Sequence, residues 1–107
     1  MSKIKLVHKD KEYFLEFSRN TARTLEERGF NLQLVDSQPN KMIPLLIQGA
    51  FMKNHASLSV KKVDEIFEAQ TGKKGLIGAV AELYGETLKS LIGDEEDEEK
   101  NATWEIV

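Results

Sequence analysis

One long apolar segment in the middle of the chain constrains the fold more than any other feature. It runs from Lys41 to His55 and reads KMIPLLIQGAFMKNH. Apolar side chains recur along it at the spacing of one helical face, and further apolar positions leave little of the helix polar. A helix of this kind belongs in a core or an interface. We therefore expect the rest of the chain to pack around its main face, formed by Ile43, Leu46, Ile47, Ala50 and Phe51.

The size and composition of the chain limit what can be built around this helix. A chain of 107 residues has the length of one domain. Cysteine is absent, which excludes a disulfide framework, a cysteine zinc site and a thiol nucleophile. The first residues lack the apolar stretch of a signal peptide, and no apolar run reaches the roughly 18 residues of a membrane helix. We expect a cytoplasmic protein.

Charge is distributed unevenly along the chain. Residues 1–93 carry 14 Lys or Arg and 11 Asp or Glu, whereas residues 94–107 carry one Lys and seven acidic residues. The run DEEDEE from Asp94 to Glu99 repels itself and is typical of disorder. We therefore expect a single domain over residues 1–93 and an acidic, flexible tail over residues 94–107. The tail ends in NATWEIV, with the only tryptophan, Trp104. It could fold back on the basic body as an added strand, dock on a partner as a short motif, or do neither.

Two short alternating runs near the N-terminus predict a β-hairpin. They cover residues 3–8 and 13–17 and flank a polar turn at residues 9–12. A lone hairpin is marginal in water, so we expect this one to lie on helices. A third alternating run, residues 31–35, predicts an extended segment or a third strand.

Four helices are predicted after the hairpin. The first covers residues 19–28, the second begins near residue 41, the third covers residues 60–70, and the fourth covers residues 76–91 after a loop at residues 71–75. Pro44 should lie in the first turn of the second helix or mark a kink. Gly78 and Gly85 weaken the fourth helix and suggest close helix contacts. The predicted fold class is α+β, mainly α, with the hairpin packed on about four helices. The expected N-caps are Ser18 and Ser59, and the expected closing glycines are Gly29 and Gly93.

Few residues suggest chemistry. His8 and His55 lie in different elements, and neither has a neighbour at metal-ligand spacing. The segment TGKKG at residues 71–75 lacks the spacing of a phosphate-binding loop. The serines have no histidine or acidic partner that the sequence singles out. We therefore expect a protein that is not an enzyme and has no catalytic residue, cofactor or metal.

Nucleic-acid binding is also disfavoured. Residues 60–91 have a helix–loop–helix outline, but the second helix carries only Lys89 as a basic residue, alongside Glu82 and Glu86. The isoelectric point near 5.4 argues in the same direction. Since the predicted helices are heavily apolar for so small a domain, we expect a protein-interaction module that oligomerises or holds a partner.

Several stretches of the chain resemble one family of small proteins. They are FLEFSRNTARTLEERGF, MIPLLIQGAFMKNH and VDEIFEAQTGKKGLIGAVAELYGETLKSLI, together with the ending TWE. The family is that of the tail assembly chaperones of long-tailed bacteriophages and prophages of Gram-positive bacteria. The resemblance covers roughly residues 13–107 and rests on packing and turn patterns rather than on catalytic motifs.

The resemblance implies a non-catalytic role in the cytoplasm of the bacterial host. Such a chaperone binds the tape-measure protein, keeps it soluble, recruits tail tube subunits and is absent from the mature virion. In many such phages a ribosomal frameshift near the end of the gene adds a C-terminal extension. The alternative is a small regulatory or adaptor protein, which could associate with DNA. Four residues are expected to border the partner groove: Ile47, Phe51, Phe67 and Tyr84. The competing interpretation is that these four lie in the internal core. Trp104 is expected to be an exposed contact.

Overall fold

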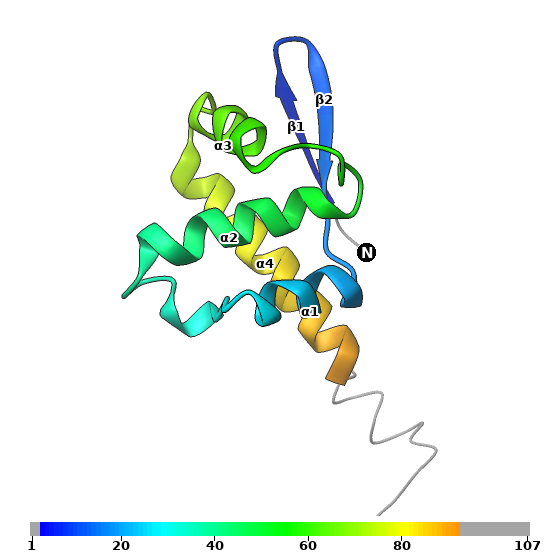
Figure 1. The fold of residues 1–107 in the computed structure, drawn as a ribbon, viewed down its shortest axis with the longest axis vertical. Helices are drawn as coiled ribbons and strands as arrows, with labels where there is room; N and C mark the ends of the chain where they lie inside the picture. Colours follow the sequence, from blue (N-terminus) through cyan, green and yellow to red (C-terminus); the bar gives the residue numbers. More distant parts are fainter. Residues whose placement is uncertain (1–2, 93–107) are drawn as a thin grey trace, which may run out of the picture.

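The computed structural model describes residues 3–92, with side chains up to residue 90, and shows a hairpin followed by four α-helices (Figure 1). This confirms the predicted α+β, mainly α fold class. The expected acidic tail over residues 94–107 lies outside the described residues. The elements in chain order are β1 (Ile4–His8), β2 (Lys11–Leu15), α1 (Arg19–Glu27), the short 3-10 helix η1 (Leu32–Leu34), α2 (Pro39–Met52), α3 (Val60–Glu68) and α4 (Lys73–Ile92).

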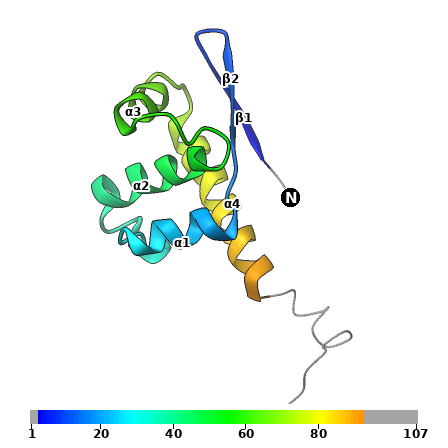
Figure 2. The same ribbon diagram turned by 45° about the vertical axis from the view of Figure 1, so that its right-hand side comes forward.

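Helix α2 is the centre of the fold, as the apolar segment predicts. It contacts α1, α3, α4, β2 and η1. In both views α1, α2 and α3 form a stack with α2 in the middle, and α4 crosses the stack (Figures 1 and 2). Burial in this position explains why so little of α2 is polar. Its buried residues are Met42, Leu46, Ile47, Gly49, Ala50 and Phe51.

The β-hairpin projects from the helical stack (Figure 2). Its strands pair antiparallel with Leu6 opposite Tyr13, and both side chains are buried. Lys9 and Asp10 form the turn with φ values of 50° and 64°, the left-handed conformation that the commonest two-residue hairpin turn requires at both positions. The second strand ends at Leu15, two residues earlier than predicted.

Helix α1 has well-formed ends. The Ser18 side chain accepts a hydrogen bond from the Thr21 N–H, and the Thr21 hydroxyl accepts one from the Ser18 N–H, which makes a reciprocal cap. At the other end Gly29 has φ of 96°, and the Phe30 N–H donates to the Leu25 carbonyl at 2.9 Å. This bond, with that from Gly29 to Glu26, satisfies carbonyls that a helix end leaves unpaired. The predicted caps at Ser18, Gly29 and Ser59 are thus confirmed.

Three local predictions were wrong. Residues 32–34 form the helix η1 instead of an extended segment, because the Asn31 side chain accepts from the Gln33 N–H and starts a turn. Helix α2 begins at Pro39 rather than near residue 41, because a proline in the first turn needs no N–H partner. Pro44 therefore lies in the second turn rather than the first, and the alternative that it marks a kink stays a prediction. Helix α4 begins at Lys73, inside the predicted loop. Its first three residues, 73–75, are exposed or half-buried and carry no apolar side chain, so no apolar pattern marks them as helical.

The glycines of α4 were also misread. A Cβ added at Gly78 or Gly85 would meet no atom within 4 Å among the described residues, so neither marks a close helix contact. The close contact lies in α2 instead. A Cβ added at Gly49 would come within 2.5 Å of Leu25, which is fully buried in α1. Gly49 therefore sets how closely α1 and α2 approach.

Candidate partner-binding grooves

An open apolar groove lies between α2 and α3, and we call it the α2–α3 groove. It has a volume of about 350 Å³. Phe51 and Met52 of α2 line it, together with Val60 and Val63 of α3. Val60 is 54% exposed, one of the most exposed large apolar side chains of the described chain. The remaining lining residues are Arg28, Gln48, His55, Ala56 and Leu58.

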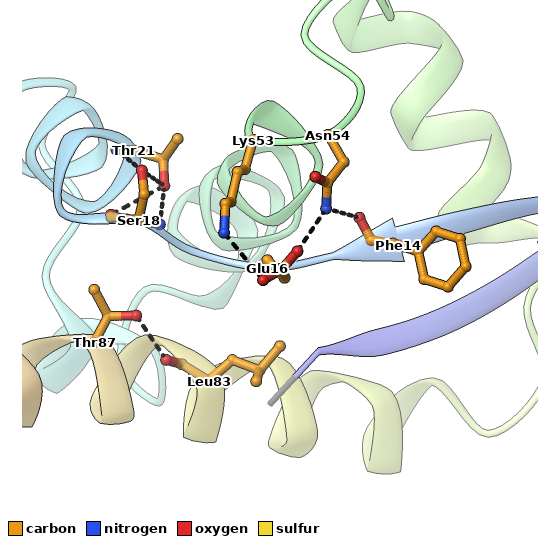
Figure 3. Close-up of polar contacts among 8 residues, drawn as sticks. All are labelled: Phe14, Glu16, Ser18, Thr21, Lys53, Asn54, Leu83 and Thr87. Carbon is orange, nitrogen blue, oxygen red and sulfur yellow. Dashed lines mark hydrogen bonds and ion pairs between the residues drawn. The ribbon is translucent and has the colours of Figure 1, made fainter. Parts of the chain in front are cut away.

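Polar contacts to β2 fix the end of α2 that forms this groove. Asn54 donates to the Phe14 carbonyl and to a Glu16 carboxylate oxygen at 3.1 and 3.0 Å, and Lys53 donates to the other Glu16 oxygen at 3.0 Å (Figure 3). The hydrogen bonds from Asn54 and Lys53 lower the pKa of Glu16 from its ordinary value. The carboxylate therefore stays charged and holds the turn after α2 against the hairpin.

His55 lines the α2–α3 groove and also contacts strand β2 of the hairpin. Its Nε2 atom accepts a hydrogen bond from the Phe14 N–H at 3.0 Å, so the imidazole is neutral when this bond is made. Its ring packs against Tyr13, with centroids 5.1 Å apart. Burial and the nearby Lys11 charge lower the pKa of His55. This lowered pKa matches the acceptor role of Nε2.

A second groove, the α1–α4 groove, runs between α1 and α4. It consists of two adjoining hollows of about 430 and 220 Å³ that share Glu26 and Leu88. The larger hollow is lined by aromatic and apolar side chains, among them Phe30, Leu32 and Tyr84. The smaller hollow lies nearer the end of α4 and is lined by Arg19, Ala22, Arg23 and Thr87.

Hydrogen bonds and burial stabilise the α4 side of this groove. Thr87 is buried, and its hydroxyl donates to the Leu83 carbonyl of the same helix at 3.1 Å (Figure 3). Tyr84 is 2% exposed and packs edge-on against Phe30 with ring centroids 5.0 Å apart. Burial, together with the negative charge of Glu26, raises the pKa of Tyr84. Tyr84 therefore forms a fixed, uncharged floor for the larger hollow.

The residues expected to border one partner groove do not converge on one place. Phe51 lines the α2–α3 groove and Tyr84 lines the α1–α4 groove, although both are almost fully buried. Ile47 is 2% exposed and belongs to the core, and Phe67 packs half-buried against it. Trp104 lies outside the described residues. A partner-binding role for these five residues stays a prediction.

Sequence reasoning did not single out the exposed residues that line the two grooves. Val60 lies in the predicted third helix, residues 60–70, and Leu32 in the alternating run over residues 31–35, and neither was predicted to be exposed at a groove. The signal for Val60 was its place directly after the cap residue Ser59, because the first turn of a helix often extends past the core. No sequence signal marks Arg19 and Arg23 as neighbours of α4.

Within residues 3–92 there is no group of three or more His, Asp or Glu side chains that could hold a metal ion. Nor does any helix of that part combine the length and the apolar character needed to cross a membrane.

Comparison with known proteins places the chain in a family. A family described as a domain of unknown function, DUF5055, matches the chain over residues 1–107. No curated protein and no solved structure matches it significantly.

Proposed function

The chain belongs to the DUF5055 family, whose function is unknown, and from this premise we propose that it is a non-enzymatic phage tail assembly chaperone. In this role it binds the tape-measure protein in the host cytoplasm, helps recruit tail tube subunits and leaves before the virion is complete. Resemblance of the ERGF, GAF, DEIF and TWE stretches to that chaperone family supports the proposal.

The observation that carries the proposal is the α2–α3 groove. Apolar side chains from α2, α3 and the turn between them line an open cavity of about 350 Å³. An amphipathic helix binds by laying apolar residues one turn apart into such a groove. The tape-measure protein of long-tailed phages is long and largely helical, so it offers many such faces. Arg28 at the edge of the groove would pair with an acidic residue flanking the apolar face.

Two valines of similar exposure allow a matched test of this groove. Val60 is 54% exposed and lines it, whereas Val7 is 51% exposed and lies in β1. Val60 is the first residue of α3, where an acidic side chain suits the helix dipole. Val60→Glu should therefore leave the fold intact and place a charge in the groove, and Val7→Glu is the control.

Each form is co-expressed with the tape-measure protein encoded nearest downstream, and the soluble fraction is separated by size-exclusion chromatography. We expect the natural chain and Val7→Glu to keep the tape-measure protein soluble and to co-elute with it. Val60→Glu should lose the complex while keeping the circular dichroism spectrum of the natural chain. Co-elution of the tape-measure protein with all three forms would reject the α2–α3 groove as the binding site.

Failure of every form to solubilise the tape-measure protein would reject the chaperone role itself. A DNA mobility shift then tests the adaptor alternative, because phosphate contacts weaken steeply with added salt.

A further inference from the structure

Two arginines at one end of the α1–α4 groove have no acidic partner in the described chain. Arg19 and Arg23 line the smaller hollow, and neither forms an ion pair with any residue between 3 and 92. Glu26 lines the same hollow without pairing with either arginine, so the two arginines outnumber the one carboxylate there. Arg19 also donates to the Ser90 carbonyl at 3.3 Å, which places it at the last turns of α4. Arg19 therefore lies close to the end of α4 at Ile92, the last described residue, and Arg23 lines the same hollow one turn along α1.

The composition of residues 93–107 complements this groove. After Gly93 the segment carries six consecutive acidic residues, from Asp94 to Glu99, and Trp104 follows five residues after that run. Along α4, read back from its end, the arginine-lined hollow at Thr87 and Leu88 comes first, and the aromatic hollow at Tyr84 follows. In the segment the acidic run precedes the tryptophan, and along α4, read back from its end, the arginine-lined hollow precedes the aromatic one. The two orders therefore match.

From this correspondence we propose that residues 94–107 dock in the α1–α4 groove of the same chain. The acidic run pairs with Arg19 and Arg23, and Trp104 enters the larger hollow against Phe30 and Tyr84. Aromatic side chains favour such edge-on or offset contacts, and the indole buries a large apolar area. Leu32, which is 36% exposed at the edge of this hollow, would be covered by the same docking.

The length of the segment permits this docking with chain to spare. Six residues separate Ser90 from Tyr84, which is about 9 Å along a helix. Residues 93–104 can span roughly 40 Å when extended. Because the tail is tethered next to the groove, its high effective concentration compensates for the weakness of each exposed ion pair. In this arrangement Trp104 is sheltered until a partner displaces it, rather than exposed as the sequence suggested.

The single tryptophan makes the proposal directly measurable, because all tryptophan fluorescence of the chain comes from Trp104. We expect the full chain to emit at shorter wavelength than a peptide of residues 93–107. Its quenching constant with acrylamide should be several-fold lower than that of the peptide. The double variant Arg19→Glu, Arg23→Glu should shift emission and quenching to the peptide values, and so should added salt in the natural chain.

A charge reversal of the same sign elsewhere is the control. Lys61 and Lys74 are exposed in α3 and α4 and form no ion pair within residues 3–92. Lys61→Glu, Lys74→Glu should leave the fluorescence of the natural chain unchanged, and circular dichroism must show that both double variants stay folded. A second test needs no arginine change, because Leu32→Glu should expose Trp104 by placing a charge in the hollow.

Three results would overturn the proposal. One is a full chain whose emission and quenching equal those of the free peptide. Another is a sheltered Trp104 that neither the arginine variant nor Leu32→Glu exposes, which would place it elsewhere, for example along the hairpin. The third is shelter that disappears on dilution together with a dimer, since the groove would then hold the tail of a second copy. None of these outcomes depends on the α2–α3 groove or on tape-measure binding.

Discussion

At the scale of single residues, Gly49 is the described glycine with the least room for a side chain. It lies where α1 crosses α2, and a Cβ there would come within 2.5–2.7 Å of three Leu25 side-chain atoms. Leu25 is fully buried, so it cannot move aside into solvent. We expect Gly49→Ala to lower the free energy of unfolding by about 1–3 kcal/mol, the usual cost of overpacking a core. Urea denaturation followed by circular dichroism measures this, and an unchanged midpoint would contradict the close approach.

Gly78 provides the opposite case on α4. It is exposed in the helix interior, and an added Cβ would meet nothing within 4 Å of the described chain. Gly78→Ala should therefore raise the free energy of unfolding by about 0.5–1 kcal/mol, because alanine costs less conformational entropy in a helix. A thermal melt should show a midpoint higher by a few degrees. A lower midpoint would mean that Gly78 has a contact that the described residues do not show.

These two glycines show what sequence reasoning can and cannot reach. The cost of a glycine inside a helix is a local property, so the sequence alone is enough to predict it for α4, and Gly78→Ala tests that prediction. The reason for a glycine depends on what lies across from it, which no pattern within one helix contains. Gly78 and Gly85 were therefore misread as contact points, and Gly49 was passed over inside a run of apolar residues.

At the scale of elements, the turn after α2 supplies hydrogen bonds to the edge of β2 that does not pair with β1. The Phe14 N–H and carbonyl face away from β1 and are satisfied by His55 and Asn54. The Glu16 N–H donates to the Ala50 carbonyl at 3.1 Å. A two-stranded hairpin is marginal in water, so these contacts and the burial of Tyr13 and Leu15 hold it to the helices.

Protonation of His55 should weaken this docking. The folded state lowers the His55 pKa, so it binds the proton less readily than the unfolded chain does. The stabilisation is then complete above the unfolded pKa of about 6.5 and is lost as the pH falls through the lower folded pKa. We expect the urea midpoint to fall between about pH 7.5 and 5.5, and His55→Gln should flatten this part of the profile.

The other histidine serves as the control for that experiment. His8 lies at the end of β1, and its buried Nε2 atom has no hydrogen-bond partner in the described chain. In His8→Gln the urea midpoint should still fall between about pH 7.5 and 5.5, as in the natural chain. If His8→Gln flattens the profile and His55→Gln does not, the assignment to His55 is wrong.

The elements also show where sequence patterns work well. Alternation predicted the hairpin, and a serine followed by an apolar stripe predicted the starts of α1 and α3. The misplaced boundaries, at η1 and at the starts of α2 and α4, lie in short or largely exposed segments that bury too few side chains to impose a period. The grooves could not be predicted either, since each is formed by elements that lie apart along the chain, such as α1 and α4.

At the scale of the whole molecule, α2 connects every other part of the core. The hairpin, α1, α3 and α4 each pack on helices rather than forming a core of their own, and one continuous cluster of buried side chains joins them. Single domains of this size usually unfold in one cooperative step. The central place of α2 makes such cooperativity a direct consequence of the architecture, which the apolar segment already indicated.

Truncating a core side chain of α2 should therefore weaken all elements together. Leu46 is fully buried, and Leu46→Ala should lower the free energy of unfolding by about 2–5 kcal/mol, through lost burial and the cavity left behind. Val60→Ala, at a half-exposed position, should change it by less than about 0.5 kcal/mol. In the Leu46→Ala variant, urea transitions followed by the histidine signals of His8 and His55 and by helical circular dichroism should coincide. If the hairpin signals were lost well before the helices, the hairpin would be a separate unit and α2 would not unify the fold.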